Sequence, residues 1–353
     1  MQRFAAALAL LVLALPFSAN AQEKPSFQEQ IDVNVALIDA VVTDNRGNQI
    51  LGLTKDDFIV KENGVVQPVE SVDYFTSRKL LSDREENAPF PVERVREDRY
   101  LIFFFDKPSD NRLFSDLAVA RNDVRKFIDE QMTANDRVAI AGHDFRLKIY
   151  SDFTNDKAAL KKALTASGAF GNGLSQAPAG DGVSILRNLA AKRLKNETGT
   201  VYEALDALAD ATRTIKARKN VVLFSPGIAD IGEEERDGVL TTRSQYFDPM
   251  IRSLNAANVT VYGVQLNRQA LLTEPLFHQR LEEITNATNG EYFRFNTSFR
   301  TAIDRVEKAA AGYYLITYRA PHAKSEHGFQ KVDVSLRDPS LRVTARSGYD
   351  LGS

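Results

Sequence analysis

The feature that most constrains the fold is an unbroken apolar run, residues 101–105, that leads directly into Asp106. A run of this length without alternating polar residues is typical of a strand buried on both faces, as in a parallel α/β sheet. A Pro-Ser-Asp turn follows at 108–110, so Asp106 stands at the carboxyl end of that strand. Ligands of parallel sheets bind at the carboxyl ends of the strands. The run therefore predicts a sheet edge with a candidate functional aspartate on it.

Strand and helix patterns alternate from Tyr100 to Ala311. The strands expected there are 100–105, 137–141, 147–150, 220–224, 259–265 and 291–295, and the expected helices are 114–132, 157–164, 201–217, 246–257, 276–288 and 298–311. Such alternation implies parallel crossovers and a Rossmann-like sheet with helices on both faces. Residues 165–182, rich in Gly, Ala and Ser, are expected to form a flexible surface loop.

Both ends of the chain have β patterns instead. In residues 31–75, Asn63-Gly64 lies between two apolar runs and is a strong signal for a hairpin. In residues 312–350, three short strands are expected, at 313–319, 329–337 and 341–346. With roughly 40 residues, each end is marginal as a domain on its own. We therefore expect one β-sandwich built from both ends, with an α/β domain at 98–311 inserted between them after a linker at 76–97.

The first 21 residues have the pattern of a secretory signal peptide. Arg3 provides the positive start, residues 4–15 form an apolar segment too short to span a bilayer, and the Ala-Asn-Ala at 19–21 is a small-residue cleavage site. We therefore expect an exported protein, periplasmic or secreted, that starts near Gln22 and has no transmembrane segment after cleavage.

The composition excludes several classes of site and partner. The chain has no cysteine, which rules out disulfides, thiolate metal sites and a cysteine nucleophile. Without Arg3 it carries 44 Lys and Arg (45 minus 1) against 47 Asp and Glu, a formal charge of −3. A nucleic-acid surface needs a basic stripe, so we expect no nucleic-acid partner.

Several motifs resemble those of a known family. In the α/β part they are the strand ending at Asp106, the Thr-Gly-Thr at 198–200 before a helix, and the helix from Leu281 that ends at an Asn-Gly before an aromatic strand. These resemble a von Willebrand factor type A (VWFA) domain. The outer motifs are VVTDNRGN at 41–48, LTKDDFIV at 53–60, ENG at 62–64, GYYLITY at 312–318 and ARSGY at 345–349. Together the motifs resemble bacterial proteins with a VWFA-related domain, the type abundant in Acidobacteria, over residues 31–350.

The resemblance implies a metal-ion-dependent adhesion site, in which Mg²⁺ is held by oxygen ligands. The family pattern is Asp-x-Ser-x-Ser after the first strand, a Thr from a second loop and an Asp from a third. Asp106, Asp110 and Thr200 fall on ligand positions of this pattern, with Thr198 as the alternative to Thr200.

Two of the expected ligands are replaced by Pro108 and Pro226, and proline has no side-chain oxygen. These replacements predict a degenerate site and a fold kept without its metal, so no cofactor is expected. Binding of Mg²⁺ is the alternative, with Ser109, Ser225 and Asp230 as compensating ligands, because all three are expected on the same sheet edge as Asp106.

Two further patterns are weaker. His143-Asp144 is expected on the same edge and could form a Ser-His-Asp arrangement with Ser109 or Ser225, but no G-x-S-x-G elbow is present. Residues 168–173 are glycine-rich but lack a directly preceding strand and the Lys-Ser/Thr of a phosphate-binding loop, which favours a mobile surface loop.

The sequence as a whole predicts an exported, non-enzymatic module that binds a protein partner in the cell envelope or outside the cell. Its contact surface is expected at the loops 106–115, 142–145, 165–200 and 225–245, because a rigid scaffold with exposed loops suits binding. Two alternatives stay open: adhesion-type binding through Mg²⁺ at a reorganised Asp106 site, and a hydrolase that uses the same edge.

Overall fold

The computed structural model describes residues 35–45, 48–76, 98–215, 217–228, 235–236, 239–240, 245–267, 275–294, 298–322 and 328–351. The chain divides into residues 1–32 and a unit at 33–353 that holds all of these. The predicted signal peptide at 1–21 and residues 77–97 of the predicted linker lie outside the described residues. Within the described part, no helix combines the length and the apolar character needed to cross a membrane.

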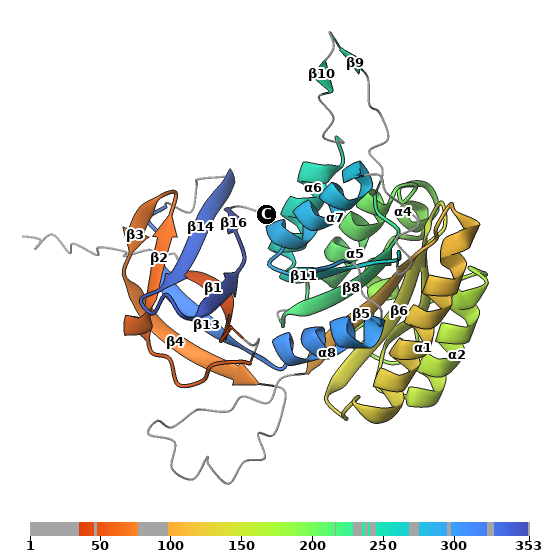
Figure 1. The fold of residues 1–353 in the computed structure, drawn as a ribbon, viewed down its shortest axis with the longest axis horizontal. Helices are drawn as coiled ribbons and strands as arrows, with labels where there is room; N and C mark the ends of the chain where they lie inside the picture. Colours follow the sequence, from red (N-terminus) through yellow and green to blue (C-terminus); the bar gives the residue numbers. More distant parts are fainter. Residues whose placement is uncertain are drawn as a thin grey trace, which may run out of the picture. The chain divides into compact units, whose positions relative to one another are not determined.

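A six-stranded sheet forms the centre of the α/β part (Figure 1). Its strand order is β12 (Tyr292–Phe293), β11 (Val259–Gln265), β8 (Lys219–Ser225), β5 (Arg99–Asp106), β6 (Asp136–His143) and β7 (Leu147–Thr154). All neighbours pair in parallel except β7, which runs antiparallel to β6. The strands β5, β6 and β8 therefore end side by side, and we call the region around their last residues, Asp106, His143 and Ser225, the carboxyl edge.

Helices on both faces of the sheet explain the apolar run in β5. Leu101, Phe103 and Phe105 pack with α1 (Phe114–Glu130), α2 (Lys157–Gly168) and α8 (Phe299–Ala309). Ile102 and Phe104 pack with α5 (Val201–Thr212), α6 (Phe247–Ala256) and α7 (Pro275–Ala287). Because successive side chains of a strand point to opposite faces, both sets are apolar. The predicted α/β class, with a parallel-rich sheet covered on both faces, is confirmed.

Strands from the two ends of the chain share two antiparallel sheets. The first sheet has the strand order β15 (Arg342–Ala345), β1 (Val35–Thr43), β13 (Gly312–Arg319) and β4 (Val69–Thr76). The second sheet has the strand order β16 (Gly348–Leu351), β14 (Gly328–Leu336), β2 (Phe58–Glu62) and β3 (Val65–Gln67). Ile38, Val60 and Ile316 are buried together in a core that both sheets share. The prediction of a β-sandwich built from both ends is therefore confirmed, whereas the domain limits 31–75, 98–311 and 312–350 stay predictions.

The strand β7 departs from the expected parallel alternation. Only residues 144–146 join it to β6, and a parallel crossover needs about a dozen residues or more. The two strands therefore form an antiparallel hairpin, with His143 opposite Leu147 and Val138 opposite Thr154.

The flexible loop expected at 165–182 is wrong in part. The helix α2 continues to Gly168, Phe170 is buried, and the Leu174 amide donates to the Ile149 carbonyl on β7 at 2.7 Å. Gly173 permits this approach, because a Cβ there would lie 2.9 Å from the same carbonyl oxygen. The segment is thus held along the edge strand, and two short helices that were not expected, α3 (Ile185–Asn188) and α4 (Ala191–Asn196), follow it.

The helix α5 ends at Thr212, five residues before the predicted end at Ala217. The Ile215 amide donates to the Thr212 carbonyl at 3.0 Å, which turns the chain out of the helix. Ile215 and Ala217 are then buried against Tyr100, so packing rather than helix propensity sets this boundary.

Candidate functional site

Asp106, the last residue of β5, is buried at the carboxyl edge with 6% of its surface exposed. Ser225, the last residue of β8, donates a hydrogen bond from Oγ to Asp106 Oδ2 at 2.7 Å. The Nδ1 atom of His143, at the end of β6, lies 3.6 Å from Asp106 Oδ1. Three strand ends thus bring together three of the side chains that the sequence places on this edge.

His143 continues the network toward the segment before α5. Its Nε2 lies 3.3 Å from the Thr198 carbonyl oxygen. Because a carbonyl oxygen only accepts hydrogen bonds, this contact places a proton on Nε2. The Thr198 hydroxyl is itself occupied, since Oγ1 donates to the Leu194 carbonyl at 2.9 Å and accepts from the Leu147 amide at 3.1 Å. Thr198 therefore joins the network through its backbone and stabilises the segment with its side chain.

The carboxylate of Asp110 is occupied by Arg112. Its two oxygens accept hydrogen bonds from the Arg112 guanidinium at 2.5 to 3.0 Å, and Oδ1 also accepts from the Arg112 amide at 2.9 Å. These hydrogen bonds hold the pKa of Asp110 below its usual range. Asp110 is thus the N-cap of the short 3₁₀ helix η3 (Asn111–Leu113) that leads into α1.

Thr200 is the N-cap of α5. Its hydroxyl accepts from the Glu203 amide at 3.1 Å, while the Glu203 carboxylate accepts from the Thr200 amide at 2.9 Å. This is a capping box, which satisfies backbone donors at both residues.

The side chains at the expected Mg²⁺ ligand positions are engaged with other protein groups. Mg²⁺ requires a near-octahedral set of oxygen ligands. Here the side chains of Asp106, Asp110 and Thr200 all bond to protein groups, and Pro108 and Pro226 supply no side-chain oxygen. Asp230, a compensating candidate, lies outside the described residues, as does most of the loop at 225–245. Metal coordination by Asp106, Asp110 and Thr200 stays a prediction.

The geometry also differs from that of a serine hydrolase. In a Ser-His-Asp relay, histidine lies between the serine hydroxyl and the aspartate. Here Asp106 lies between Ser225 and His143, and the Nε2 atom of His143 faces a carbonyl oxygen. Ser225 therefore has no imidazole base in this arrangement.

Part of the expected contact surface lies away from the carboxyl edge. Ser184 Oγ and the Ile185 amide donate to the buried carboxylate of Asp152 at 2.7 and 2.8 Å. Asp152 is near the end of β7, and Thr154 pairs with Val138 close to the start of β6. The middle of the segment 165–200 therefore lies toward the amino end of the parallel strands, because β7 is antiparallel.

The tip of the β6–β7 hairpin carries a residue that sequence reasoning did not single out. Phe145 has 82% of its surface exposed and a left-handed backbone with φ 56°. Next to it, Asp144 accepts hydrogen bonds from Lys107 at 3.0 Å and from Lys148 at 3.2 Å. Burial opposes ionisation, but the two lysines hold the pKa of Asp144 below its usual range. An aromatic residue in a three-residue turn was the available signal in the sequence.

Comparisons with known proteins find matches among solved structures only. No family model matches the sequence, and no curated protein matches it. Among solved structures, an aerotolerance-related membrane protein from Bacteroides fragilis has 13% identity and a TM-score of 0.38, covering 60% of this chain and 98% of that chain. The vWF domain of the type V pili tip protein Mfa5 from Porphyromonas gingivalis has 13% identity and a TM-score of 0.38, covering 59% and 93%. A von Willebrand factor type A protein from Catenulispora acidiphila has 10% identity and a TM-score of 0.38, covering 91% and 74%.

These neighbours include von Willebrand factor A proteins. The α/β class of this chain is established by its own strand order and helix layers. The narrower resemblance to the Acidobacteria type stays a prediction.

Proposed function

We propose that the chain is an exported, non-enzymatic module that binds a protein partner through the carboxyl edge of its central sheet. The observation that supports this most strongly is Phe145, an exposed aromatic side chain at a hairpin tip. Exposed aromatic residues on rigid supports are typical anchors of protein interfaces. The proposed partner lies in the cell envelope or outside the cell, in line with the signal peptide expected at 1–21.

The backbone of Phe145 adds to this argument. A left-handed φ costs a non-glycine residue about 1–2 kcal/mol, and glycine or asparagine would avoid most of that cost. An exposed phenylalanine at this position is therefore unfavourable for folding and for solubility. Residues with a strained backbone cluster at functional sites.

The hairpin is well supported for such a role. Asp144 bonds to Lys107 after β5 and to Lys148 in β7. Lys148 also donates to the Phe170 carbonyl at 2.5 Å, and the Lys107 ammonium lies 5.8 Å from the centre of the Phe170 ring. A pre-ordered anchor loses little conformational entropy on binding.

The test is a pull-down from the organism's own envelope fraction with the mature chain as bait. A partner should be retained by the wild type, identified by mass spectrometry, purified and titrated. Phe145→Ala should weaken its affinity by about 30-fold, because an interface hot spot contributes about 2 kcal/mol or more. Phe329→Ala is the matched control, since Phe329 is 40% exposed but lies on β14 of the sandwich.

The same experiment separates the alternatives. Retention of the partner in a chelator supports binding without a metal, whereas loss in chelator and recovery with Mg²⁺ would support the adhesion-type alternative. Equal affinity of Phe145→Ala and the wild type would refute the proposal. Turnover of a substrate that disappears in Ser225→Ala and His143→Ala would favour the hydrolase instead.

A further inference from the structure

A cavity of about 310 Å³ lies between the sandwich strands β1 and β15 and the α/β part. Thr43 and Arg342 line it from the sandwich, and Arg218, Lys308 and Asn289 line it from the α/β part. Its volume is at the lower end of the range for small-molecule sites. Arg218 directly precedes β8, so the cavity is separate from the carboxyl edge, where β8 ends.

Cationic side chains outnumber carboxylates around the cavity. The cations are Arg218, Arg305, Lys308 and Arg342, and the carboxylates are Asp44 and Glu291, which gives a formal charge of +2 (4 minus 2). Arg305 forms an ion pair with Glu291 at 2.5 Å. Lys308 and Arg342 are exposed at the cavity and form no salt bridge with any residue that the structure describes. Two cations are thus available to a ligand.

Glu291 is occupied by its ion pair with Arg305. Burial raises the pKa of its carboxyl, although Arg305 and Arg342 act in the other direction. Asp44 is engaged in its own turn, where both carboxylate oxygens accept hydrogen bonds from Asn48 at 2.8 and 2.9 Å.

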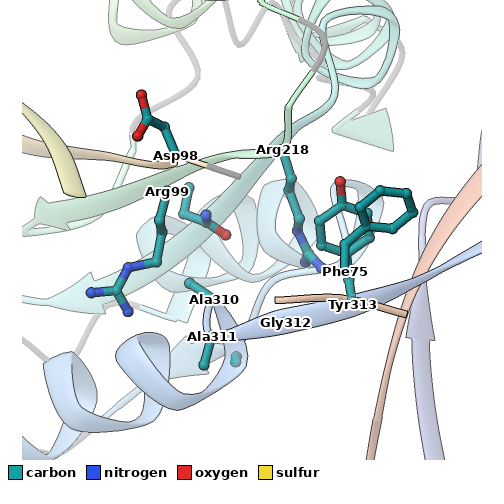
Figure 2. A pocket seen from close by; sticks show the side chains of 10 residues that line it. Phe75, Asp98, Arg99, Arg218, Ala310, Ala311, Gly312 and Tyr313 are labelled. Atoms are coloured by element: carbon teal, nitrogen blue, oxygen red, sulfur yellow. The ribbon is translucent and has the colours of Figure 1, made fainter. Parts of the chain in front are cut away.

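Arg218 supplies a buried donor on the lining. Only 6% of its surface is exposed, its Nε donates to Thr260 Oγ1 at 3.0 Å, and Asp39 Oδ2 lies 3.6 Å from the same atom. Its Nη1 is buried without a hydrogen-bond partner in the described part of the chain. Figure 2 shows the side chain reaching toward Phe75 and Tyr313, which line a smaller neighbouring pocket together with Arg218.

Asn289 supplies a second donor of this kind. Its Nδ2 is buried and has no hydrogen-bond partner among the residues described. An unsatisfied buried donor destabilises the fold, and more strongly so when it belongs to a charged group. A ligand oxygen in the cavity would remove this destabilisation at both residues once their side chains turn toward it.

We propose that this cavity binds a small oxyanion, a molecule bearing a phosphate or carboxylate group. Lys308 and Arg342 attract the anion at the mouth, and the side chains of Arg218 and Asn289 turn from their closed positions to donate hydrogen bonds to its oxygens. Guanidinium groups match the geometry of both oxyanions, and hydrogen bonds to charged groups are the strong ones. The proposal does not depend on the function proposed for the carboxyl edge.

Calorimetric titration of the mature chain tests this site, with inorganic phosphate in one arm and succinate in the other. Sodium chloride at matched ionic strength is the reference, because it screens charge without offering an oxyanion. We expect saturable binding in at least one arm and an increase in unfolding temperature with the same ligand. The stronger arm identifies the class of oxyanion.

Substitutions at the mouth show whether the binding occurs in this cavity. Lys308→Gln and Arg342→Gln should each weaken binding by about tenfold, the loss of one charge-assisted hydrogen bond. Both side chains are exposed, so the fold should tolerate their loss. Lys192→Gln on α4 is the matched control, because it removes an exposed lysine outside the cavity. Absence of binding in both arms, or equal weakening by the control, would overturn the proposal.

Discussion

The buried carboxylate of Asp106 accepts a hydrogen bond from a neighbouring strand. Ser225 provides the shorter contact, at 2.7 Å, and His143 lies at 3.6 Å. Ser225 is itself fully buried, so water does not replace its hydroxyl easily. The strand-end aspartate that the sequence marks as a ligand therefore also contributes to the stability of the edge.

We predict that Ser225→Ala lowers the free energy of unfolding by about 1.5–3 kcal/mol, because it removes a hydrogen bond to a buried charged group. Urea denaturation followed by circular dichroism measures this change. Ser109→Ala is the control: Ser109 is exposed on the same edge, and its loss should change stability by less than about 0.5 kcal/mol. Equal effects of the two substitutions would contradict a structural role for the Ser225–Asp106 contact.

At the scale of elements, local sequence decides the β2–β3 hairpin. Asn63 and Gly64 have φ of 48° and 84°, the left-handed pair of a type I′ turn. The turn sets the register in which Val60 faces Gln67, and this register keeps Val60 in the sandwich core. The Asn-Gly signal was sufficient to predict this hairpin because both the turn and its strands are local.

The turn provides a direct test of backbone strain. Gly64→Ala should destabilise the chain by about 1–2 kcal/mol, since no atom lies within 4 Å of the added Cβ and only the left-handed backbone opposes it. Gly182→Ala is the matched control, because its Cβ also meets open space but its φ is not left-handed. Thermal unfolding should separate the two variants; a Gly64→Ala variant as stable as Gly182→Ala would show that the turn relaxes.

Other elements could be predicted in type but not in extent. The direction of β7 was predictable from the three residues that join it to β6, which are too few for a crossover. The end of α5 could not be predicted from the sequence, because Ile215 and Ala217 pack against Tyr100, more than 100 positions away, instead of continuing the helix. Helix boundaries follow tertiary packing wherever packing is worth more than propensity.

At the scale of the whole molecule, a buried network joins both ends of the chain. Glu62 on β2 accepts hydrogen bonds from Tyr318 on β13 at 2.5 Å and from Tyr349 on β16 at 3.0 Å. His322 also contacts the Glu62 carboxylate. Because β13 belongs to the other sheet of the sandwich, the network connects the two sheets.

This network predicts loss of stability at alkaline pH. Burial, and then the hydrogen bond to Glu62, raise the pKa of Tyr349 to about 12, above the ordinary value of about 10 in the unfolded chain. The stability that this raised pKa contributes is fully present below a pH of about 10. It is lost as the pH rises toward 12, because the unfolded state releases the phenol proton first. Urea denaturation between pH 8 and 12 should show the decline.

The Tyr349→Phe variant separates this residue from the other tyrosines, because it keeps the ring and removes the proton. Its free energy of unfolding should decline less steeply with pH than that of the wild type. The difference in slope should correspond to the release of up to about one proton on unfolding. Burial also raises the pKa of Tyr318, so part of the decline should persist. Identical slopes for the variant and the wild type would exclude a contribution from Tyr349.

The sequence by itself determined what depends on local periodicity. The two-sided apolar run of β5, the alternation of strands and helices and the Asn63-Gly64 turn each follow from residues close together in the chain. The pairing of the two ends followed from size, since neither end could bury a core alone.

Only the tertiary structure decided the partners of the site residues. Asp106 bonds to Ser225, 119 positions away, whereas Asp110 bonds to Arg112 beside it and Thr200 to Glu203 in the next turn. The sequence shows which side chains can coordinate a metal or accept a proton. Which of them are already satisfied depends on distances that packing sets between distant strands. The same packing gathers the cations of the cavity beside β1 and β15 from separate segments.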